Sequence, residues 1–258
     1  MSIRWLERGE LIPAVVDRLE KIEVVLDIGC GIEPQNYVRP MVHICCEPFG
    51  QYVECLKEKT AKSFDRTFLI VQAAWEDAVS IFPPKSVDTV FLVDVIEHIE
   101  KEAGARLLQS TVRIARRQVA VFTPLGFLPQ HAEGMDAWGM DGASWQEHKS
   151  GWLPEDFEEF WDIYASRAFH TVDHKGRPLS PPHGAFWAIM THSEEASVGA
   201  ETLDRKKRIK RVHDLSVENT SADLDGFILA MRGVLRGRSI RWGRRLVDSL
   251  VAWDRKRR

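Results

Sequence analysis

The chain has 258 residues and a mass of 29.5 kDa, and 44% of its residues are hydrophobic and 28% are charged. This composition excludes a collagen-like, low-complexity or wholly disordered protein, and the length allows one large domain or one domain with an appendage. The four cysteines have neither the pattern of a disulfide-rich secreted protein nor the paired spacing of a zinc site, so we predict no metal. Reduced thiols, and charges throughout the first 20 residues, favour a cytoplasmic protein without a signal peptide.

The net charge of −3 conceals a division along the chain. Residues 201–258 contain 16 lysines and arginines against 8 acidic residues, whereas residues 1–200 contain 19 against 30. An acidic body argues against an extended nucleic-acid surface, so we expect no nucleic-acid partner. The basic segment is instead a candidate for peripheral contact with an anionic membrane surface or with another protein.

Apolar runs and amphipathic stretches alternate from the N-terminus onward. Helical spacing predicts helices over 9–21, 49–59 and 101–115. Continuous apolar runs, typical of parallel strands buried on both faces, predict strands over 24–28, 41–46, 68–72, 87–95 and 118–122. Two further strands are expected over 163–170 and 185–191 as an antiparallel pair. This alternation predicts an α/β fold with a doubly wound, mostly parallel, seven-stranded Rossmann-like sheet and an antiparallel edge.

Two segments depart from this alternation. Residues 123–151 are rich in glycine and aromatic residues and predict a long irregular loop, which in compact domains is usually functional or disordered. Residues 227–253 place apolar side chains at helical spacing with arginines between them, which is typical of a basic amphipathic helix. We therefore expect one domain over 1–195 and a basic helical extension over 196–258, which lies on a membrane surface, docks on protein or is disordered.

Features at the ends of two predicted strands point to a nucleoside ligand. Gly29 and Gly31 follow the first buried strand, where glycines let a ligand approach the backbone closely. Glu47 ends the second strand, where a carboxylate can accept both hydroxyls of an adenosine ribose. A glycine pair alone is also compatible with a simple tight turn. The position of Glu47 at the end of the next strand makes a nucleoside-binding loop the better interpretation.

The same loop disfavours a phosphate-bearing ligand. The third glycine of a pyrophosphate-binding loop is missing, and Glu33 would repel phosphate. Pro34 and Pro40 leave room for only a short helix before the second strand. A cation without phosphates suits the acidic side chains nearby, and S-adenosylmethionine has a sulfonium, an ammonium and a ribose.

The sequence VVLDIGCG at 24–31 resembles the first motif of the class I S-adenosylmethionine-dependent methyltransferases. Segment 72–77 is similar to that family's adenine-contacting loop, segment 87–98 to its fourth motif, and segment 122–124 to the residues that follow its fifth strand. The resemblance covers about residues 20–192. It implies S-adenosylmethionine as the cofactor. The resemblance also implies which residues bind each part of the cofactor. The methionine end would contact Asp27, Gly29, Cys30 and Gly31, and Asp94 would lie near the transferred methyl group. Glu47 would hold the ribose, and Trp75 and Glu76 would lie near the adenine. Glu33 and Ala74 depart from the family pattern.

Two shorter segments resemble bacterial methyltransferase-like proteins of the surface-polysaccharide type. These are Ile-Glu-Pro-Gln at 32–35 and His-Lys-Ser-Gly-Trp at 148–152. The resemblance implies a small-molecule or glycan acceptor. Tryptophans at 138, 145 and 152 could line an acceptor pocket, although such residues more often pack a lid against its domain.

A hydroxyl acceptor requires a base that removes its proton. His148 and His98 are the candidate catalytic residues, and the alternatives are loop anchoring for His148 and helix capping or packing for His98. The favoured function is O-methylation. A non-catalytic scaffold with the same fold at a membrane-associated assembly is the alternative, and a nicotinamide-dependent oxidoreductase is disfavoured by Glu33 and the missing glycine.

Overall fold

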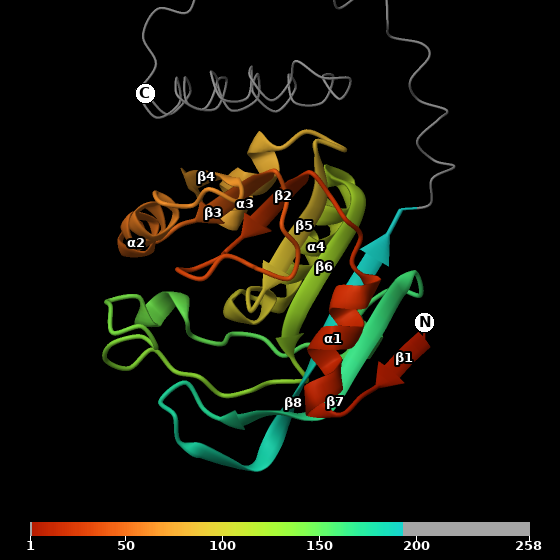
Figure 1. The fold of residues 1–258 in the computed structure, drawn as a ribbon. Helices are drawn as coiled ribbons and strands as arrows, with labels where there is room; N and C mark the ends of the chain where they lie inside the picture. Colours follow the sequence, from red (N-terminus) through yellow and green to blue (C-terminus); the bar gives the residue numbers. More distant parts are fainter. Residues whose placement is uncertain (1, 193–258) are drawn as a thin grey trace, which may run out of the picture. The chain divides into compact units, whose positions relative to one another are not determined.

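The structure, a computed structural model, describes residues 2–192 and has a single sheet at its centre (Figure 1). The sheet has eight strands in the order β1-β7-β8-β6-β5-β2-β3-β4. Their bounds are β1 Ser2–Trp5, β2 Val24–Ile28, β3 Val42–Glu47, β4 Thr67–Gln72, β5 Val87–Val93, β6 Ala115–Pro124, β7 Trp161–Val172 and β8 Pro178–Thr191. The central strands β2 and β5 are mostly apolar and almost entirely buried, which suits strands covered on both faces.

The predicted mostly parallel sheet is confirmed. β2 pairs in parallel with β3 and β5, β3 with β4, and β5 with β6. The reversed strand β8 lies between β6 and β7 and is antiparallel to both, so the predicted antiparallel pair is present. The sheet has eight strands rather than seven because β1 adds a parallel strand beside β7. Its four residues are mixed in polarity and mostly exposed, so they carry no apolar run.

Helices cover both faces of the sheet. They are α1 (Arg8–Arg18), α2 (Gly50–Thr60), α3 (Trp75–Ile81) and α4 (Lys101–Ile114). Leu11, Val15 and Leu19 at the α1 end of the chain pack with Val25 of β2 in one buried cluster. Leu56 of α2 packs with Cys45 of β3, and Cys45 lies beside Asp27 of β2 in the sheet. Asp27 and Val25 point to the same face of the sheet, so α1 and α2 both cover that face. Figure 1 shows α1 in front of the sheet and α4 behind it.

Two connections differ from the predictions. Residues 29–41 link β2 to β3 without a helix, so the short helix allowed before the second strand does not form in this described segment. The helix α3 was not predicted, because its seven residues follow β4 after only two residues and carry two acids in the first turn. Within the loop predicted over 123–151, residues 125–151 contain one 3₁₀ turn, Ala143–Trp145, which confirms an irregular loop, and residues 123–124 belong to β6.

The loop lies at one particular end of the sheet. In Figure 1 the green segment that follows β6 lies at the carboxyl ends of the parallel strands, at the same end as the turn between β7 and β8. None of the helices between residues 2 and 192 combines the length and the apolar character that a membrane crossing requires. The predicted amphipathic helix over 227–253 lies outside the described residues, and so does the boundary predicted at 195/196.

Candidate functional site

A cavity of about 480 Å³ opens at the carboxyl ends of β2, β5 and β6. Ligands of open α/β sheets bind at this edge, because the loops that leave neighbouring strands diverge there. Seven of the residues predicted from the sequence line the cavity: Asp27, Gly29, Cys30, Gly31, Asp94, His98 and His148. The other three, Glu47, Trp75 and Glu76, are not part of its lining.

The loop after β2 is shaped by its two glycines. Gly29 has φ +69° and Gly31 has φ +56°, both in the left-handed region that favours glycine. A Cβ atom on Gly29 would lie 3.0 Å from Cγ2 of Val95, so this position is also closely packed. The Gly29 N–H donates to the carbonyl of Cys46 in β3 at 2.7 Å, and this hydrogen bond holds the start of the loop against β3. The glycines therefore bring bare backbone to the wall of the cavity.

Asp27 is buried beneath this loop and already has several hydrogen-bond donors. Its Oδ2 accepts the Gln35 N–H at 2.8 Å and lies 3.1 Å from Nε2 of His43, which is fully buried in β3. The opposite nitrogen of His43, Nδ1, lies 3.5 Å from a guanidinium nitrogen of Arg66. Because a guanidinium can only donate, this pattern makes Nδ1 the acceptor and Nε2 the donor to Asp27. Asp27 thus holds the loop in place and lends negative charge to the cavity.

Glu47 lies directly behind the same loop. Its Oε2 accepts the Gly31 N–H at 2.9 Å and its Oε1 accepts the Phe49 N–H at 3.0 Å. Burial raises the pKa of Glu47 to about 7, and the two backbone hydrogen bonds oppose this shift. The side chain is only 3% exposed, so it is not open to the cavity in this conformation.

Trp75 and Glu76 occupy the first turn of α3, after the end of β4. Trp75 is half-buried and Glu76 is exposed. They lie on the side of the sheet toward β3 and β4, where the adenine-contacting segment was expected. Their contact with an adenine remains a prediction.

Trp138 joins the long loop (residues 125–160) to the loop after β2 that contains Gly29 and Gly31. A Cβ atom on Gly31 would lie 2.4 Å from Cη2 of Trp138, so the indole ring rests against the glycine. The ring also meets Tyr52 of α2 edge-on, with 4.9 Å between ring centroids. Trp138 lines the cavity, whereas Trp145 is 47% exposed and Trp152 is buried. Of the three tryptophans proposed for an acceptor pocket, Trp138 alone faces this cavity.

Asp94 and Glu97 form an acidic pair at the end of β5. Asp94 adopts φ +51°, an uncommon conformation for a residue other than glycine, and is exposed to the cavity. Glu97 is buried, and its Oε2 accepts the hydroxyl of Thr123 at 3.1 Å. Burial and the adjacent Asp94 carboxyl group raise the pKa of Glu97 well above its usual range. Such a pair cannot hold two uncompensated negative charges.

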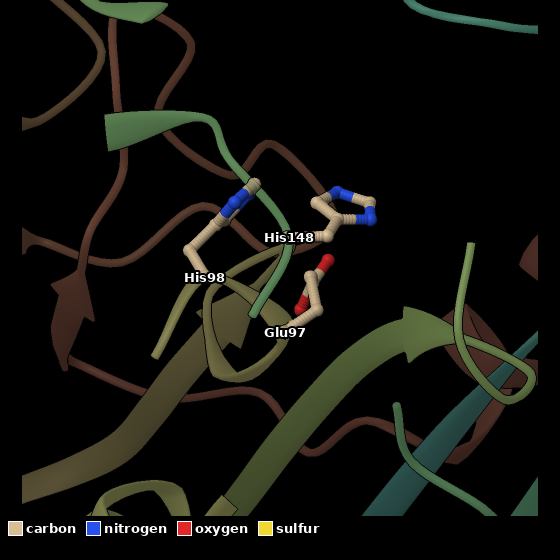
Figure 2. A group of neighbouring side chains, drawn as sticks. All are labelled: Glu97, His98 and His148. Carbon is tan, nitrogen blue, oxygen red and sulfur yellow. The ribbon is translucent and has the colours of Figure 1, made fainter. Parts of the chain in front are cut away.

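His98 and His148 lie together because two segments are joined by hydrogen bonds. The Lys149 and Ser150 N–H groups both donate to the Glu97 carbonyl, at 2.7 and 3.0 Å. The indole N–H of Trp152 donates to the Ile96 carbonyl at 3.1 Å. Gly104 leaves room for that indole, since a Cβ there would lie 2.5 Å from the ring. The imidazoles consequently meet edge-on, with 4.8 Å between centroids (Figure 2).

Both imidazoles are neutral near neutral pH. Burial, reinforced by His148, lowers the pKa of His98 to about 4. Burial also lowers the pKa of His148, and a hydrogen bond to Leu128 opposes the shift. A neutral imidazole keeps one nitrogen lone pair, which a general base or a metal ligand requires.

Several lining residues were not predicted from the sequence. They are Gln35, Tyr37, Gln130, Gln146, His170 and His174. Glu97, adjacent to the cavity-lining His98, was also not named as a functional residue. The signal for Glu97 was its place between Asp94 and His98 in one short motif. His170 lies near the end of β7 and His174 in the turn between β7 and β8, and only the fold brings them to the site.

The comparisons with known proteins find similarity only among solved structures. No family model matches the chain, and no curated protein matches it. YcgJ from Bacillus subtilis aligns with TM-score 0.37 and 16% identity over 46% of this chain, which spans 52% of YcgJ. Magnesium protoporphyrin IX methyltransferase from Synechocystis PCC 6803 with bound S-adenosylmethionine aligns with TM-score 0.45 and 13% identity, over 71% of this chain and 79% of its own. A SAM-dependent methyltransferase from Archaeoglobus fulgidus aligns with TM-score 0.44 and 16% identity, over 71% and 94%.

Proposed function

We propose that this chain is an S-adenosylmethionine-dependent methyltransferase that methylates a hydroxyl group of a small-molecule or glycan acceptor. The observation that carries the proposal is an acidic cavity at the carboxyl ends of β2 and β5, bordered by the bare backbone of Gly29 and Gly31. The cavity favours positive charge. Burial raises the pKa of the lining residue Tyr37 to about 12, and Asp94 and Asp27 add to this effect.

The connection from β2 to β3 also argues against a phosphate-bearing ligand. Dinucleotide sites place the pyrophosphate at the N-terminus of a helix that follows the glycine loop. Residues 29–41 form no helix here, and Glu33, which lines the cavity, is paired with Lys59 at 2.6 Å. The carboxylates of Asp27 and Asp94 in the cavity lining suit a sulfonium nucleoside better than a pyrophosphate.

In the proposed reaction the acceptor oxygen forms a bond to the methyl carbon as the carbon–sulfur bond breaks. The sulfur leaves with the bonding electron pair as S-adenosylhomocysteine, and the hydroxyl proton passes to a base at the cavity. Such an in-line displacement depends mainly on proximity and orientation. His98 and His148 are the groups that we assign to the acceptor hydroxyl, because both line the cavity and both are neutral.

The test is calorimetry of the full chain with S-adenosylhomocysteine. We expect one binding site, which Glu47→Ala weakens at least about tenfold through loss of the ribose hydrogen bonds. Glu54→Ala is the matched control, since Glu54 is an exposed acid of α2 paired with Lys57 at 3.0 Å. Absence of binding to the wild-type chain, or tighter binding of NAD, would reject the proposal. Incubation of cell extracts with isotopically labelled methyl donor would then identify the acceptor.

A further inference from the structure

A compact group of potential metal ligands lies beside the cavity. Glu97, His98 and His148 each offer one ligand-type atom, and these atoms all lie within 4.8 Å of one another. Figure 2 shows that Glu97 and His98 come from the turn after β5, while His148 comes from the long loop. The hydrogen bonds that join Lys149, Ser150 and Trp152 to this turn fix the two segments relative to each other.

The hydrogen bonds of His98 and His148 leave the Nε2 atom of each imidazole free to bind a metal ion. Nδ1 of His98 lies 3.1 Å from the Glu147 carbonyl oxygen, and Nδ1 of His148 lies 2.6 Å from the Leu128 carbonyl oxygen. A carbonyl oxygen only accepts, so each Nδ1 carries the hydrogen and each Nε2 keeps a lone pair. Metal-binding histidines show this arrangement, in which a backbone carbonyl orients the ring through its other nitrogen.

Glu97 has an unused oxygen in the same place. The carboxyl group is 2% exposed, and its Oε1 atom is buried without a hydrogen-bond partner. The neighbouring polar group is Asp94, which is itself an acceptor when ionised. A buried carboxylate oxygen without a hydrogen-bond partner is costly in free energy, and a bound cation would satisfy it.

We propose that Glu97, His98 and His148 bind a divalent first-row transition-metal ion, with Asp94 beside it. Two imidazole nitrogens and one carboxylate oxygen favour Mn²⁺, Fe²⁺, Co²⁺ or Zn²⁺ over Mg²⁺ or Ca²⁺, which prefer oxygen ligands. His98 and His148 also line the cavity, so an ion held by them would be reachable from the cavity. The Glu97 Oε1 atom, which has no hydrogen-bond partner, is the carboxylate oxygen that we assign to the ion.

The role of the ion rests on the proposed function. An ion held by these residues would lower the pKa of a coordinated hydroxyl, whose proton would leave to solvent as the oxygen attacks the methyl carbon. The two histidines would then act on the acceptor through the ion and not as the bases assigned above. This proposal differs from the expectation from the sequence that no metal is bound.

The experiment uses the full chain, freed of metal with a chelator and titrated with MnCl₂ or ZnCl₂ by calorimetry, with electron paramagnetic resonance of Mn²⁺ as a second readout. We expect one ion per chain, and at least about tenfold weaker binding in Glu97→Gln and His148→Gln. His131→Gln is the matched control, because His131 is an exposed histidine of the same loop. Thermal melts verify that each variant is folded, and His148→Gln keeps the test valid if Glu97→Gln does not fold.

The possible results separate this inference from the proposed function. S-adenosylhomocysteine binding without a stoichiometric Mn²⁺ or Zn²⁺ site would overturn the metal site and leave the methyltransferase proposal standing. Metal binding that is unchanged in both variants, or Mg²⁺ binding as tight as Mn²⁺ binding, would also overturn it. A metal site lost in the variants of a chain that binds no S-adenosylhomocysteine would support the metal site and reject the methyltransferase.

Discussion

The indole ring of Trp138 rests on Gly31, so closely that a Cβ atom on the glycine would lie 2.4 Å from the ring. The N–H of the same glycine donates to Glu47 at 2.9 Å. Trp138 therefore covers the part of the glycine loop that is joined to the proposed ribose acceptor. Because Glu47 is only 3% exposed, the predicted contact of its carboxylate with a ribose requires the covering side chains to move aside.

Replacement of Gly31 by alanine tests this contact. Both Gly31 and Gly176 have a positive φ, so alanine at either position carries a backbone strain of about 1–2 kcal/mol. A Cβ on Gly176 meets nothing within 4 Å, whereas a Cβ on Gly31 meets the Trp138 ring. We expect Gly31→Ala to lower the free energy of unfolding by at least about 1 kcal/mol more than Gly176→Ala, as measured by urea denaturation.

The double variant separates the steric contact from the strain. In a Trp138→Ala background the ring is absent, so Gly31→Ala should destabilise the protein by about as much as Gly176→Ala does. An equal loss of stability from Gly31→Ala with and without the Trp138 ring would show that the ring does not press on this glycine.

Binding of S-adenosylhomocysteine is expected to depend on pH through Glu47. Burial raises the pKa of Glu47 to about 7, with a smaller contribution from the Asp27 carboxylate. The ionised form is the stronger acceptor for ribose hydroxyls, and its fraction increases as the pH rises through 7. We expect the affinity to rise by up to about tenfold between pH 6 and pH 8, measured by calorimetry at constant ionic strength.

The same shift acts with the opposite sign on the stability of the ligand-free protein. The folded state holds the Glu47 proton to a higher pH than the unfolded state does, so the stability contributed by this group falls as the pH rises from about 4.5 to about 7. Glu47→Gln should flatten both profiles. A pH dependence of binding that persists in Glu47→Gln would assign it to another group, such as Asp94.

The sheet was predictable because its strands carry strong local signals. β2, β3 and β5 are nearly continuous apolar runs, and Glu47 and the glycines stand at the strand ends where the fold places a site. The strand β1 and the helix α3 have four and seven residues, too few to show a periodicity. Their formation depends on pairing with β7 and packing on α4, which are contacts distant in sequence.

The site was predictable only in part, for the same physical reason. Asp27, Gly31 and Asp94 occupy strand ends and follow from the order of the elements. The proximity of His98 and His148 depends on backbone hydrogen bonds between segments 50 residues apart, in a loop without any period. Trp138 was one of three tryptophans with similar surroundings in sequence, and only the fastening of the loop distinguishes it from Trp145 and Trp152.

The long loop is held in place over Gly31 through one carboxylate, that of Asp136. Oδ1 of Asp136 accepts the N–H groups of Trp138 and Met140, both at 2.8 Å, and Oδ2 accepts the Gly142 N–H at 3.1 Å and the Tyr52 hydroxyl. Burial opposes ionisation of Asp136, but these hydrogen bonds hold its pKa below the usual range. We expect Asp136→Ala to release the loop.

The measurement is amide hydrogen exchange of residues 138–142. Loss of several hydrogen bonds to a charged acceptor should lower the free energy of local opening by roughly 1–3 kcal/mol, which corresponds to about 10- to 100-fold faster exchange. Asp141→Ala is the matched control, because Asp141 is an exposed acid of the same loop whose carboxylate accepts one long hydrogen bond, from Gln51 at 3.4 Å. Exchange in Asp136→Ala as slow as in Asp141→Ala would mean that Trp138 packing, and not the carboxylate, holds the loop over the glycine backbone.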